Sequence, residues 1–280
     1  EAFERGVIAP YADAYAAGET PNPCIECNAR VKFDELLRRA SLLGAETLAT
    51  GHYARVVDSP DGPRVARARD GARDQSYFLY RTTPQQLARL VFPVGGMLKA
   101  EVRAYAAAAG LPSAERPESR EACFAPDARA RDELVRARHP EALTPGSVVD
   151  ATGAPVGRHR GIAHYTVGQR KGLGSGGGPT RYIVRIDPAT NTLVAGDRAD
   201  LAVTRIEAVD PVWRPVAPEA PLTARVRYRG DEVPCTASVD DDGRLLVHLH
   251  APLLGVSPGQ AVVCYAGDIV IGGGRIGEAR

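Results

Sequence analysis

The stretch KFDELLRRASLLGAETLATGH, residues 32–52, decides the fold of the first part of the chain. Its first half predicts an amphipathic helix, which Gly44 is suited to end. The apolar residues at helical spacing are Phe33, Leu36, Leu37, Ala40 and Leu43. ETLAT, residues 46–50, then predicts a short buried strand that ends at Gly51.

Working outward, PQQLARLVF (84–92) and KAEVRAYAAAAG (99–110) predict two further helices, the second closed by Gly110. Helices that alternate with short apolar strands are typical of a parallel sheet. We therefore predict that residues 1–125 form part of a doubly wound α/β domain.

After about Pro126 the pattern changes. RDELVRARHP (131–140) predicts one more helix, and strand and turn signals follow from Gly146, so we predict a small mixed central domain over 126–202. Residues 203–280 read as short strands with alternating side chains and predict an antiparallel β-barrel. The stretches that carry this signal are LTARVRYRG (222–230), RLLVHLH (244–250) and QAVVCYAGDIVIGG (260–273).

The composition is that of an ordinary globular protein. Of 280 residues, 44% are apolar and 25% are charged, and 35 basic side chains nearly balance 34 acidic ones. The chain has no run of about 18 apolar residues and no signal-peptide pattern, so we expect a cytoplasmic protein with no membrane contact. The only methionine is Met97, and we therefore expect that a segment upstream of Glu1 is missing.

Five cysteines in such a chain favour reactive or metal-bound thiols over a disulfide framework. In TPNPCIECN (20–28), Cys24 and Cys27 precede a helix expected to begin near Arg30, whose dipole should lower the thiol pKa values. The pair fits half a zinc site, a redox pair, an iron–sulfur anchor or no chemical role. Without a second Cys-x-x-Cys we disfavour a complete zinc site and expect no metal.

The other three cysteines divide into two groups. Cys123 lies in RPESREACFAP (116–126), where Arg116 and Arg120 make an exposed electropositive setting as well supported as a buried one. Cys235 and Cys264 lie in strand patterns and are expected to be structural.

Three further segments have an open interpretation. Gly51 and His52, at the carboxyl end of a parallel strand, suit either close approach of a nucleotide or an ordinary turn. GLGSGGGP (172–179) lacks the strand and helix of a phosphate loop and is expected to be a flexible surface loop. The mixed basic and tyrosine residues of 157–174 and 224–230 fit RNA binding or a solvated face.

Six motifs, taken in order, resemble the tRNA-specific 2-thiouridylase (MnmA, also TrmU) family over essentially the whole chain. They are TPNPCIECN (20–28), ATGHYA (49–54), RDQSYFLY (73–80), ESREACF (118–124), HYTVGQRKGLG (164–174) and RVRY (225–228). The resemblance implies an ATP-pyrophosphatase domain of the doubly wound type, a small central domain and a C-terminal β-barrel.

The resemblance also implies a chemistry. ATP, with Mg²⁺, adenylates the 2-carbonyl oxygen of the wobble uridine in the tRNA anticodon stem-loop. Cys123 would carry a persulfide supplied by an upstream sulfur-donor protein. Cys27 would be the nucleophile that releases the sulfur and forms a disulfide with Cys123. We expect both thiols on solvent-accessible loops near Gly51 and Asn22.

Contacts are carried over residue by residue, with Gly51 expected to bind ATP. Positions expected to contact tRNA are Asn22, Pro23, Cys24, His52, Arg73, Asp74, Gln75, Arg227, Tyr228 and Gln260. Many family members have Asp where this chain has Cys24, so no carboxylate role is carried over. The family's SGGxDSS phosphate loop has no match here, so we expect the chain to lack most of its ATP site and to be inactive by itself.

Two alternatives stay open. The chain could be a truncated, non-catalytic tRNA-binding fragment, or Cys24, Cys27 and Cys123 could hold the iron–sulfur cluster of a different tRNA thiolase.

Overall fold

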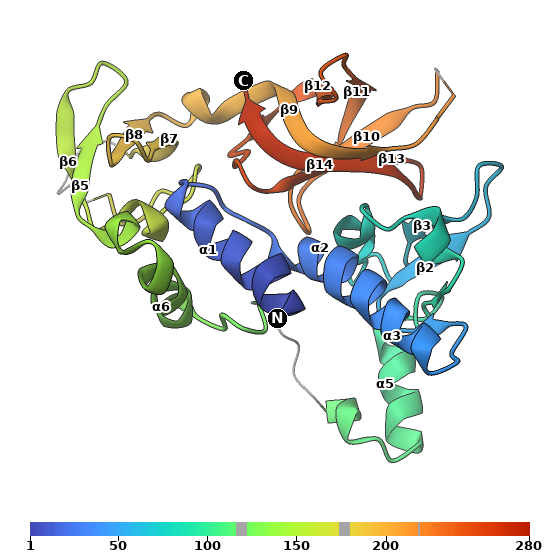
Figure 1. Ribbon diagram of the computed structural model, residues 1–280. Coiled ribbons are helices and arrows are strands. Elements are labelled where there is room, and N and C mark those ends of the chain that lie inside the picture. Colours follow the sequence, from blue (N-terminus) through green and yellow to red (C-terminus); the bar gives the residue numbers. More distant parts are fainter. Residues whose placement is uncertain (116–121, 174–179, 218) are drawn as a thin grey trace.

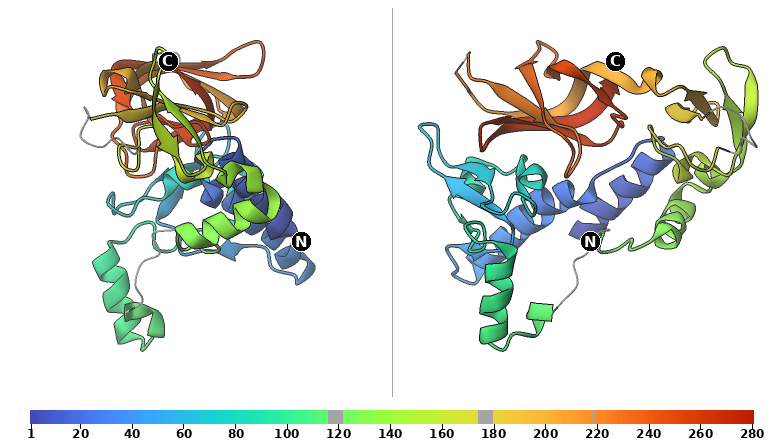
Figure 2. Two further views of the ribbon diagram at one scale, coloured as in Figure 1. Left: turned by 90° about the vertical axis from the view of Figure 1, so that its left-hand side faces the viewer. Right: turned by 180° about the vertical axis from the view of Figure 1, so that it is seen from behind.

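The computed structural model describes residues 1–115, 122–173, 180–217 and 219–280. A line of helices runs through the middle of the molecule, and the C-terminal barrel and the central strands lie on the same side of it (Figures 1 and 2). The line consists of η1 (Glu4–Ile8), α1 (Ala9–Ala16), α2 (Pro23–Glu26), η2 (Cys27–Glu35) and α3 (Leu36–Leu42). No helix in these described ranges is long and apolar enough to cross a membrane.

The helix that carries Cys24 and Cys27 begins earlier than predicted. Pro23 is its first residue, where a fixed φ favours the helix and the missing N–H has no intrahelical partner to lose. Helical turns continue without interruption from Pro23 to Leu42. The predicted start near Arg30 is therefore wrong, and both cysteines lie inside the helix.

The predicted apolar face of this helix is only partly correct. Phe33 and Leu37 are buried, whereas Leu36 and Leu43 are 43% and 87% exposed. The π-helical turns of η2 follow an i→i+5 pattern, so the side chains leave the 3.6-residue period that the prediction assumed. Gly44 has φ +77° and lies just past the helix end, as predicted.

The predicted parallel pairing is present but short, and the prediction that the strand at 46–50 is buried is wrong, because Leu48 is half-buried and Ala49 is exposed. β1 (Leu48–Ala49) pairs in parallel with β4 (Leu90–Val91). The helix predicted over 84–92 is restricted to α4 (Pro84–Leu87), which starts with a capping box. The rest of that prediction is wrong, because the chain leaves the helix to pair with β1.

The remaining elements of the first part lead to the barrel. A hairpin of β2 (Ala54–Val57) and β3 (Arg64–Arg67) joins the barrel sheet where Ala66 pairs with Ile269. Next come η3 (Ser76–Leu79), α5 (Lys99–Ala108) and η4 (Pro112–Glu115). The end of α5 at Gly110, with φ +65°, agrees with the prediction, and the helix points away from the barrel (Figure 1).

In its described residues the central region contains one α-helix and a four-stranded sheet. α6 (Ala128–Arg138) begins after Asp127, whose carboxylate accepts a hydrogen bond from the Ala130 amide. In sheet order the strands are β6 (Pro155–His159), β5 (Gly146–Val149), β8 (Thr192–Gly196) and β7 (Tyr182–Asp187). The turns are η5 (Pro140–Leu143), η6 (Ile162–His164) and η7 (Ala199–Leu201). Most of the loop predicted at 172–179 lies outside the described residues.

Six antiparallel strands form a closed barrel at the C-terminal end, as predicted. They are β9 (Ala202–Trp213), β10 (Leu222–Arg225), β11 (Val233–Val239), β12 (Leu245–Leu254), β13 (Ala261–Ala266) and β14 (Ile269–Ala279). Pairing of β13 with β14 closes the ring. The strand predicted over 222–230 is too long, because β10 ends at Arg225 and the Gly230 amide then donates to the Arg227 carbonyl in a turn.

Three buried apolar clusters join these parts. One fills the barrel and includes Cys235 and Cys264, so the prediction that both are buried is confirmed. A second runs from the first part onto β13, where Tyr77 donates a hydrogen bond to the Ala261 carbonyl. The third joins α1 to the central region through Ala12. The line of helices is therefore anchored to the barrel and to the central sheet.

Candidate active site

Cys24 and Cys27 lie one helical turn apart at the start of the helix. Cys24 is exposed, Cys27 is half-buried, and all five cysteines of the chain are free thiols. Packing around the two sulfurs raises the pKa of both thiols, and the Lys32 cation acts in the opposite direction. The predicted lowering of these pKa values is therefore wrong, because desolvation outweighs the favourable charges.

Cys123 lies near the same two thiols, although it is far from them in sequence. A thiolate at Cys123 raises the pKa of Cys24 and of Cys27, which places the three sulfurs within range of one another's charge. Cys123 is exposed, as one of the two sequence interpretations had it. Arg116 and Arg120, expected to make its surroundings electropositive, lie outside the described residues.

The neighbour of Cys123 anchors it to the first helix. The chain makes a tight turn, closed by a bridge between Ala122 and Ala125. Phe124 packs edge-on against Phe3 and Tyr11, with ring centroids 5.5 Å and 5.1 Å away. Cys123 is thus presented on a turn, as expected, whereas the expectation of a loop for Cys27 is wrong.

A cavity of about 400 Å³ opens beside the start of the helix. Asn22 and Pro23 form part of one wall, and Gln260 from the barrel forms part of another. The Gln260 amide donates to the Thr20 carbonyl at 2.7 Å, which holds the segment before the helix against the barrel. Three residues predicted to contact tRNA therefore converge on one cavity.

The charges around this cavity are largely paired with one another. Glu26 accepts hydrogen bonds from Arg30 at 2.7 Å and from Arg81 at 2.8 Å. Arg275 donates to Glu19 at 3.1 Å. Because these cations already have carboxylate partners, the cavity suits an uncharged polar group better than a phosphate.

Gly51 and His52 follow β1 at its carboxyl end, as predicted, but they face different environments. A Cβ at Gly51 would meet no atom within 4 Å, so the space beside its backbone is open. His52 is 8% exposed, lies between Phe33 and Phe92, and has Nδ1 2.8 Å from Thr50 Oγ1. Burial lowers the pKa of His52 to about 4, so its ring is neutral at neutral pH.

Gln75 fixes the backbone of the loop that follows β1, residues 50–53, which we call the Gly51 loop. The side-chain oxygen of Gln75 accepts a hydrogen bond from the Tyr53 backbone amide at 2.9 Å. The backbone amide of Gln75 donates to the Tyr53 carbonyl at 2.7 Å. The predicted tRNA-contacting residue Gln75 therefore also fixes the backbone two residues after Gly51.

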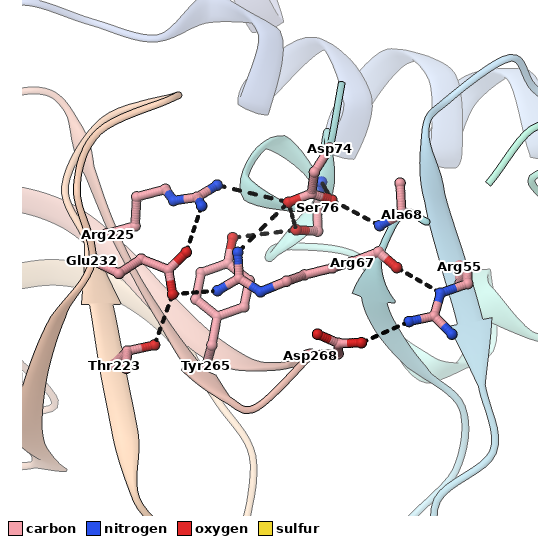
Figure 3. Close-up of polar contacts among 10 residues, drawn as sticks. All are labelled: Arg55, Arg67, Ala68, Asp74, Ser76, Thr223, Arg225, Glu232, Tyr265 and Asp268. Atoms are coloured by element: carbon pink, nitrogen blue, oxygen red, sulfur yellow. Dashed lines mark hydrogen bonds and ion pairs between the residues drawn. The ribbon is translucent and has the colours of Figure 1, made fainter. Parts of the chain in front are cut away.

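Asp74 is buried between Arg67 of β3 and Arg225 of β10, and Figure 3 shows its polar contacts. Its carboxylate accepts hydrogen bonds from the Ala68 amide at 3.0 Å and from the Ser76 hydroxyl at 2.8 Å. It also lies 3.8 Å from the Arg67 guanidinium and 3.7 Å from that of Arg225. Contact of Asp74 with tRNA stays a prediction, and in this structure the carboxylate is an internal anchor.

Arg227 and Tyr228 lie in the turn that follows β10. Arg227 is exposed. The half-buried Tyr228 ring packs against Phe78 at a centroid distance of 4.5 Å, and the Arg229 guanidinium lies 5.1 Å from the Tyr228 centroid. The predicted tRNA contact is therefore accessible at Arg227, whereas the Tyr228 ring already has neighbours.

Sequence reasoning missed Lys32. Its charge lowers the pKa of Cys24, of Cys27 and of His52, so it lies within electrostatic range of all three. Lys32 is five residues after Cys27, which an α-helix places on a different face but a π-helical segment such as η2 places about one turn away. No periodic pattern in the sequence signals this.

The described part of the chain contains no group of three or more His, Cys, Asp or Glu side chains that could hold a metal ion. Cys24, Cys27 and Cys123 are all described. They therefore do not form a ready-made ligand set for an iron–sulfur cluster.

Comparison with known proteins explains the arrangement. Three family models match successive segments: "tRNA methyl transferase HUP domain" at 1–127, "tRNA methyl transferase PRC-barrel domain" at 133–197 and "Aminomethyltransferase beta-barrel domain" at 203–276. A tRNA-specific 2-thiouridylase MnmA of Chloroflexus aurantiacus is 49% identical over 278 residues, 98% of this chain and 77% of its own length. The chain belongs to the MnmA family.

Other MnmA proteins are nearly as similar. That of Rhodospirillum centenum is 46% identical and aligns over 99% of this chain and 73% of its own length. That of Moorella thermoacetica is 44% identical and aligns over 98% and 78%. The resemblance drawn from the six motifs is thus confirmed, as is the predicted order of an α/β domain, a central domain and a barrel. The exact boundaries after residues 125 and 202 stay predictions.

The buried neutral His52 predicts a pH dependence of stability for this MnmA-family protein. Its folded pKa of about 4 lies below the ordinary value of 6.5, so the unfolded chain binds the proton first as the pH falls. The contribution of the neutral His52 ring to the free energy of unfolding is fully present above pH 6.5 and is lost as the pH falls towards 4. Between pH 7 and pH 5 the wild type should lose about 1–2 kcal/mol more than His52→Asn, measured by urea denaturation. Equal losses would contradict the assignment.

Proposed function

We propose that the protein is a tRNA-uridine 2-sulfurtransferase that replaces the 2-oxygen of the wobble uridine with sulfur from a cysteine persulfide, in an ATP-dependent reaction. The names of the MnmA relatives support tRNA as substrate. The observation that carries the proposal is the proximity of Cys27 and Cys123, with the cavity of Asn22, Pro23 and Gln260 opening beside the same helix.

The cavity is suited to a single nucleobase. Its volume of about 400 Å³ falls within the range of small-ligand pockets. An enzyme that modifies a base must take that base out of its stack and bind it in a pocket. The paired charges and the amide side chain of Asn22 fit the neutral, polar edge of uracil.

Cys123 and Cys27 have different roles in the proposed reaction. The uridine 2-oxygen first attacks the α-phosphorus of ATP, pyrophosphate leaves, and the oxygen becomes a leaving group. The terminal sulfur of the Cys123 persulfide then bonds to C2, and AMP departs with the oxygen. The Cys27 thiol, whose ionisation the Lys32 charge favours, loses its proton and attacks the remaining Cys123 sulfur. The new sulfur then stays on the base and a Cys27–Cys123 disulfide forms. A thiol reductant restores both thiols, and a persulfide donor protein reloads Cys123.

Gly51 fits a role at the ATP site. The structure itself does not require a glycine there, because a Cβ would meet no atom within 4 Å. The open space beside this backbone, at the carboxyl end of β1, suits close approach of a nucleotide with its Mg²⁺.

Gly51→Ala should therefore raise the KM for ATP by about tenfold or more, because the added methyl group would overlap the nucleotide. The melting temperature and the affinity for tRNA should not change. Gly96→Ala is the matched control, since Gly96 is also exposed with nothing within 4 Å of an added Cβ. An unchanged KM in Gly51→Ala, measured by pyrophosphate release, would remove Gly51 from the ATP site.

The proposed function is tested by incubating the intact protein with a tRNA transcript that has uridine at the wobble position, ATP and a persulfide-loaded sulfur donor. We expect 2-thiouridine in the digested tRNA by mass spectrometry, and none when ATP is omitted. If 2-thiouridine is absent under all conditions while the protein remains folded, the proposal is wrong, and the alternative of a non-catalytic tRNA-binding fragment takes its place.

A further inference from the structure

Lys32 is a half-buried cation for which the described part of the chain provides no carboxylate partner. The acidic residue three positions later on the helix, Glu35, already forms ion pairs with Arg38 at 3.0 Å and with Arg39 at 2.7 Å. A charge that is partly removed from water without an opposite charge costs free energy. An anion that binds beside Lys32 would offset that cost.

Three titratable neighbours of Lys32 bring it no negative charge in the resting protein. The lysine charge acts on the thiols of Cys24 and Cys27 and on the His52 ring. Packing raises the pKa of both thiols above the ordinary value of 9.0, and burial lowers the pKa of His52 to about 4. At neutral pH all three groups are therefore uncharged, and none of them compensates the lysine.

The packing of the helix brings Lys32 to the Gly51 loop as well as to the thiols. Phe33, the next residue, packs edge-on against His52 with ring centroids 5.6 Å apart, and His52 directly follows Gly51. Cys27 is the first residue of η2, and Lys32 lies about one π-helical turn after it. Side chains on a helix lean toward its N-terminus, which directs the lysine side chain toward Cys27. One cation is thus near both the sulfur chemistry and the expected nucleotide site.

We propose that Lys32 binds the phosphate of the adenylated uridine and stabilises the AMP that departs from it. The inference rests on the proposed function, in which the uridine 2-oxygen is adenylated. In that intermediate the phosphate links the nucleotide, expected at Gly51, to the carbon that receives sulfur beside Cys27. The phosphate must therefore lie in the region of the molecule that Lys32 occupies.

Lys32 acts at the step that transfers sulfur. The terminal sulfur of the Cys123 persulfide bonds to C2 of uracil, the bond from C2 to oxygen breaks, and the oxygen leaves on AMP with the bonding electron pair. The negative charge of the attacking persulfide thus passes to the AMP phosphate. A cation already in place stabilises charge that develops in the transition state, and lysine is a common phosphate ligand. The same contact holds AMP after the reaction, so affinity for AMP reports it without turnover.

The first test compares the binding of AMP and adenosine to the intact protein by titration calorimetry, because these ligands differ only in the phosphate. The wild type should bind AMP more tightly than adenosine. Lys32→Gln should weaken AMP binding by about tenfold or more and leave adenosine binding unchanged. Its melting temperature should stay the same or rise, because the substitution removes an unpaired cation. Lys32→Arg, which keeps the charge, should retain most of the preference for AMP.

Arg38→Gln is the matched control for this comparison. Arg38 is on the same helix, and its side chain is 59% exposed. Its loss removes a cation of the same helix but not one that faces the thiols. This variant should bind AMP and adenosine like the wild type.

The second test follows the departure of AMP. With ATP labelled at the α-phosphate and no sulfur donor, the label on the tRNA measures adenylation, and adding the persulfide-loaded donor then releases labelled AMP. Release should be about 10²-fold slower or more in Lys32→Gln. Cys27→Ser should release AMP at the wild-type rate, because Cys27 acts only after AMP has left. A lysine that only favoured ionisation of Cys27 would therefore not change this rate.

Each result separates the proposal from its rivals. If Lys32→Gln keeps the wild-type preference for AMP, or if the wild type binds AMP no better than adenosine, Lys32 does not bind the phosphate. If Cys27→Ser slows AMP release as much as Lys32→Gln does, Lys32 acts through the thiol and the proposal is also wrong. Wild-type protein that puts no label on the tRNA would instead contradict the proposed function itself.

Discussion

Replacing Cys123 with serine is expected to lower tRNA thiolation by at least about 10³-fold, because a hydroxyl cannot carry the sulfane sulfur. Cys27→Ser should cause a loss of similar size, since release of sulfur from the mixed intermediate needs the second thiol. The measurement is 2-thiouridine formed per minute under the conditions given above, with the melting temperature of each variant as a check of folding.

Cys24→Ser is the matched comparison for the sulfur chemistry, because Cys24 is a free thiol one turn away on the same helix. It is predicted to contact tRNA but not to carry sulfur, and serine keeps a small polar side chain there. The Cys24→Ser variant should retain thiolation within a few-fold of the wild type. Mild oxidation followed by peptide mapping should crosslink Cys27 to Cys123, which requires their Cα atoms to come within about 7 Å. Activity that survives Cys123→Ser, together with a Cys24–Cys27 crosslink, would replace the sulfur relay with a local redox pair.

Asp74→Ala should lower the free energy of unfolding by about 3–5 kcal/mol. The carboxylate is buried, faces both Arg67 and Arg225, and accepts three hydrogen bonds from two backbone amides and a hydroxyl. Its loss leaves two cations without part of their compensation. The measurement is urea denaturation at neutral pH.

The control for Asp74 lies in the same region (Figure 3). Asp268 forms an ion pair with Arg55 at 2.9 Å, but its side chain is 65% exposed. Asp268→Ala should therefore cost less than about 1 kcal/mol. If the two variants are equally stable, the buried network does not hold the hairpin of β2 and β3 to the barrel.

The fold could be predicted where a local pattern and its tertiary environment agree. The alternation of residues 244–250 and 260–273 predicted strands that the closed barrel contains, and Gly110 marked the end of α5. Where they disagreed, the prediction failed. Residues 222–230 alternate throughout, yet the turn at Arg227–Gly230 ends the strand early. The helix over 84–92 failed because its last residues pair with β1.

The site was predictable in its residue types but not in its contacts. The resemblance to the family predicted roles for Cys27, Cys123 and Gln75. No local pattern in the sequence indicated that Gln75 would bind the Tyr53 backbone or that Lys32 would lie near Cys24 and Cys27. These contacts depend on how the helix, the Gly51 loop and the barrel pack together. Sequence spacing does not encode that packing. A π-helical segment such as η2 also changes which residues share one face of the helix.

The hydrogen bond from the Gln260 side chain to the Thr20 carbonyl determines when, during synthesis, the site can assemble. These residues are 240 positions apart, and Gly259 with φ +85° admits the approach because a Cβ would lie 2.9 Å from the Thr20 nitrogen. Contacts of such sequence separation form late, since a long loop must close first. During synthesis Thr20 leaves the ribosome well before its partner exists. The cysteine-bearing helix therefore reaches its final position only when the last barrel strands have been translated, and in an unfinished nascent chain the wall that Gln260 contributes to the cavity is missing.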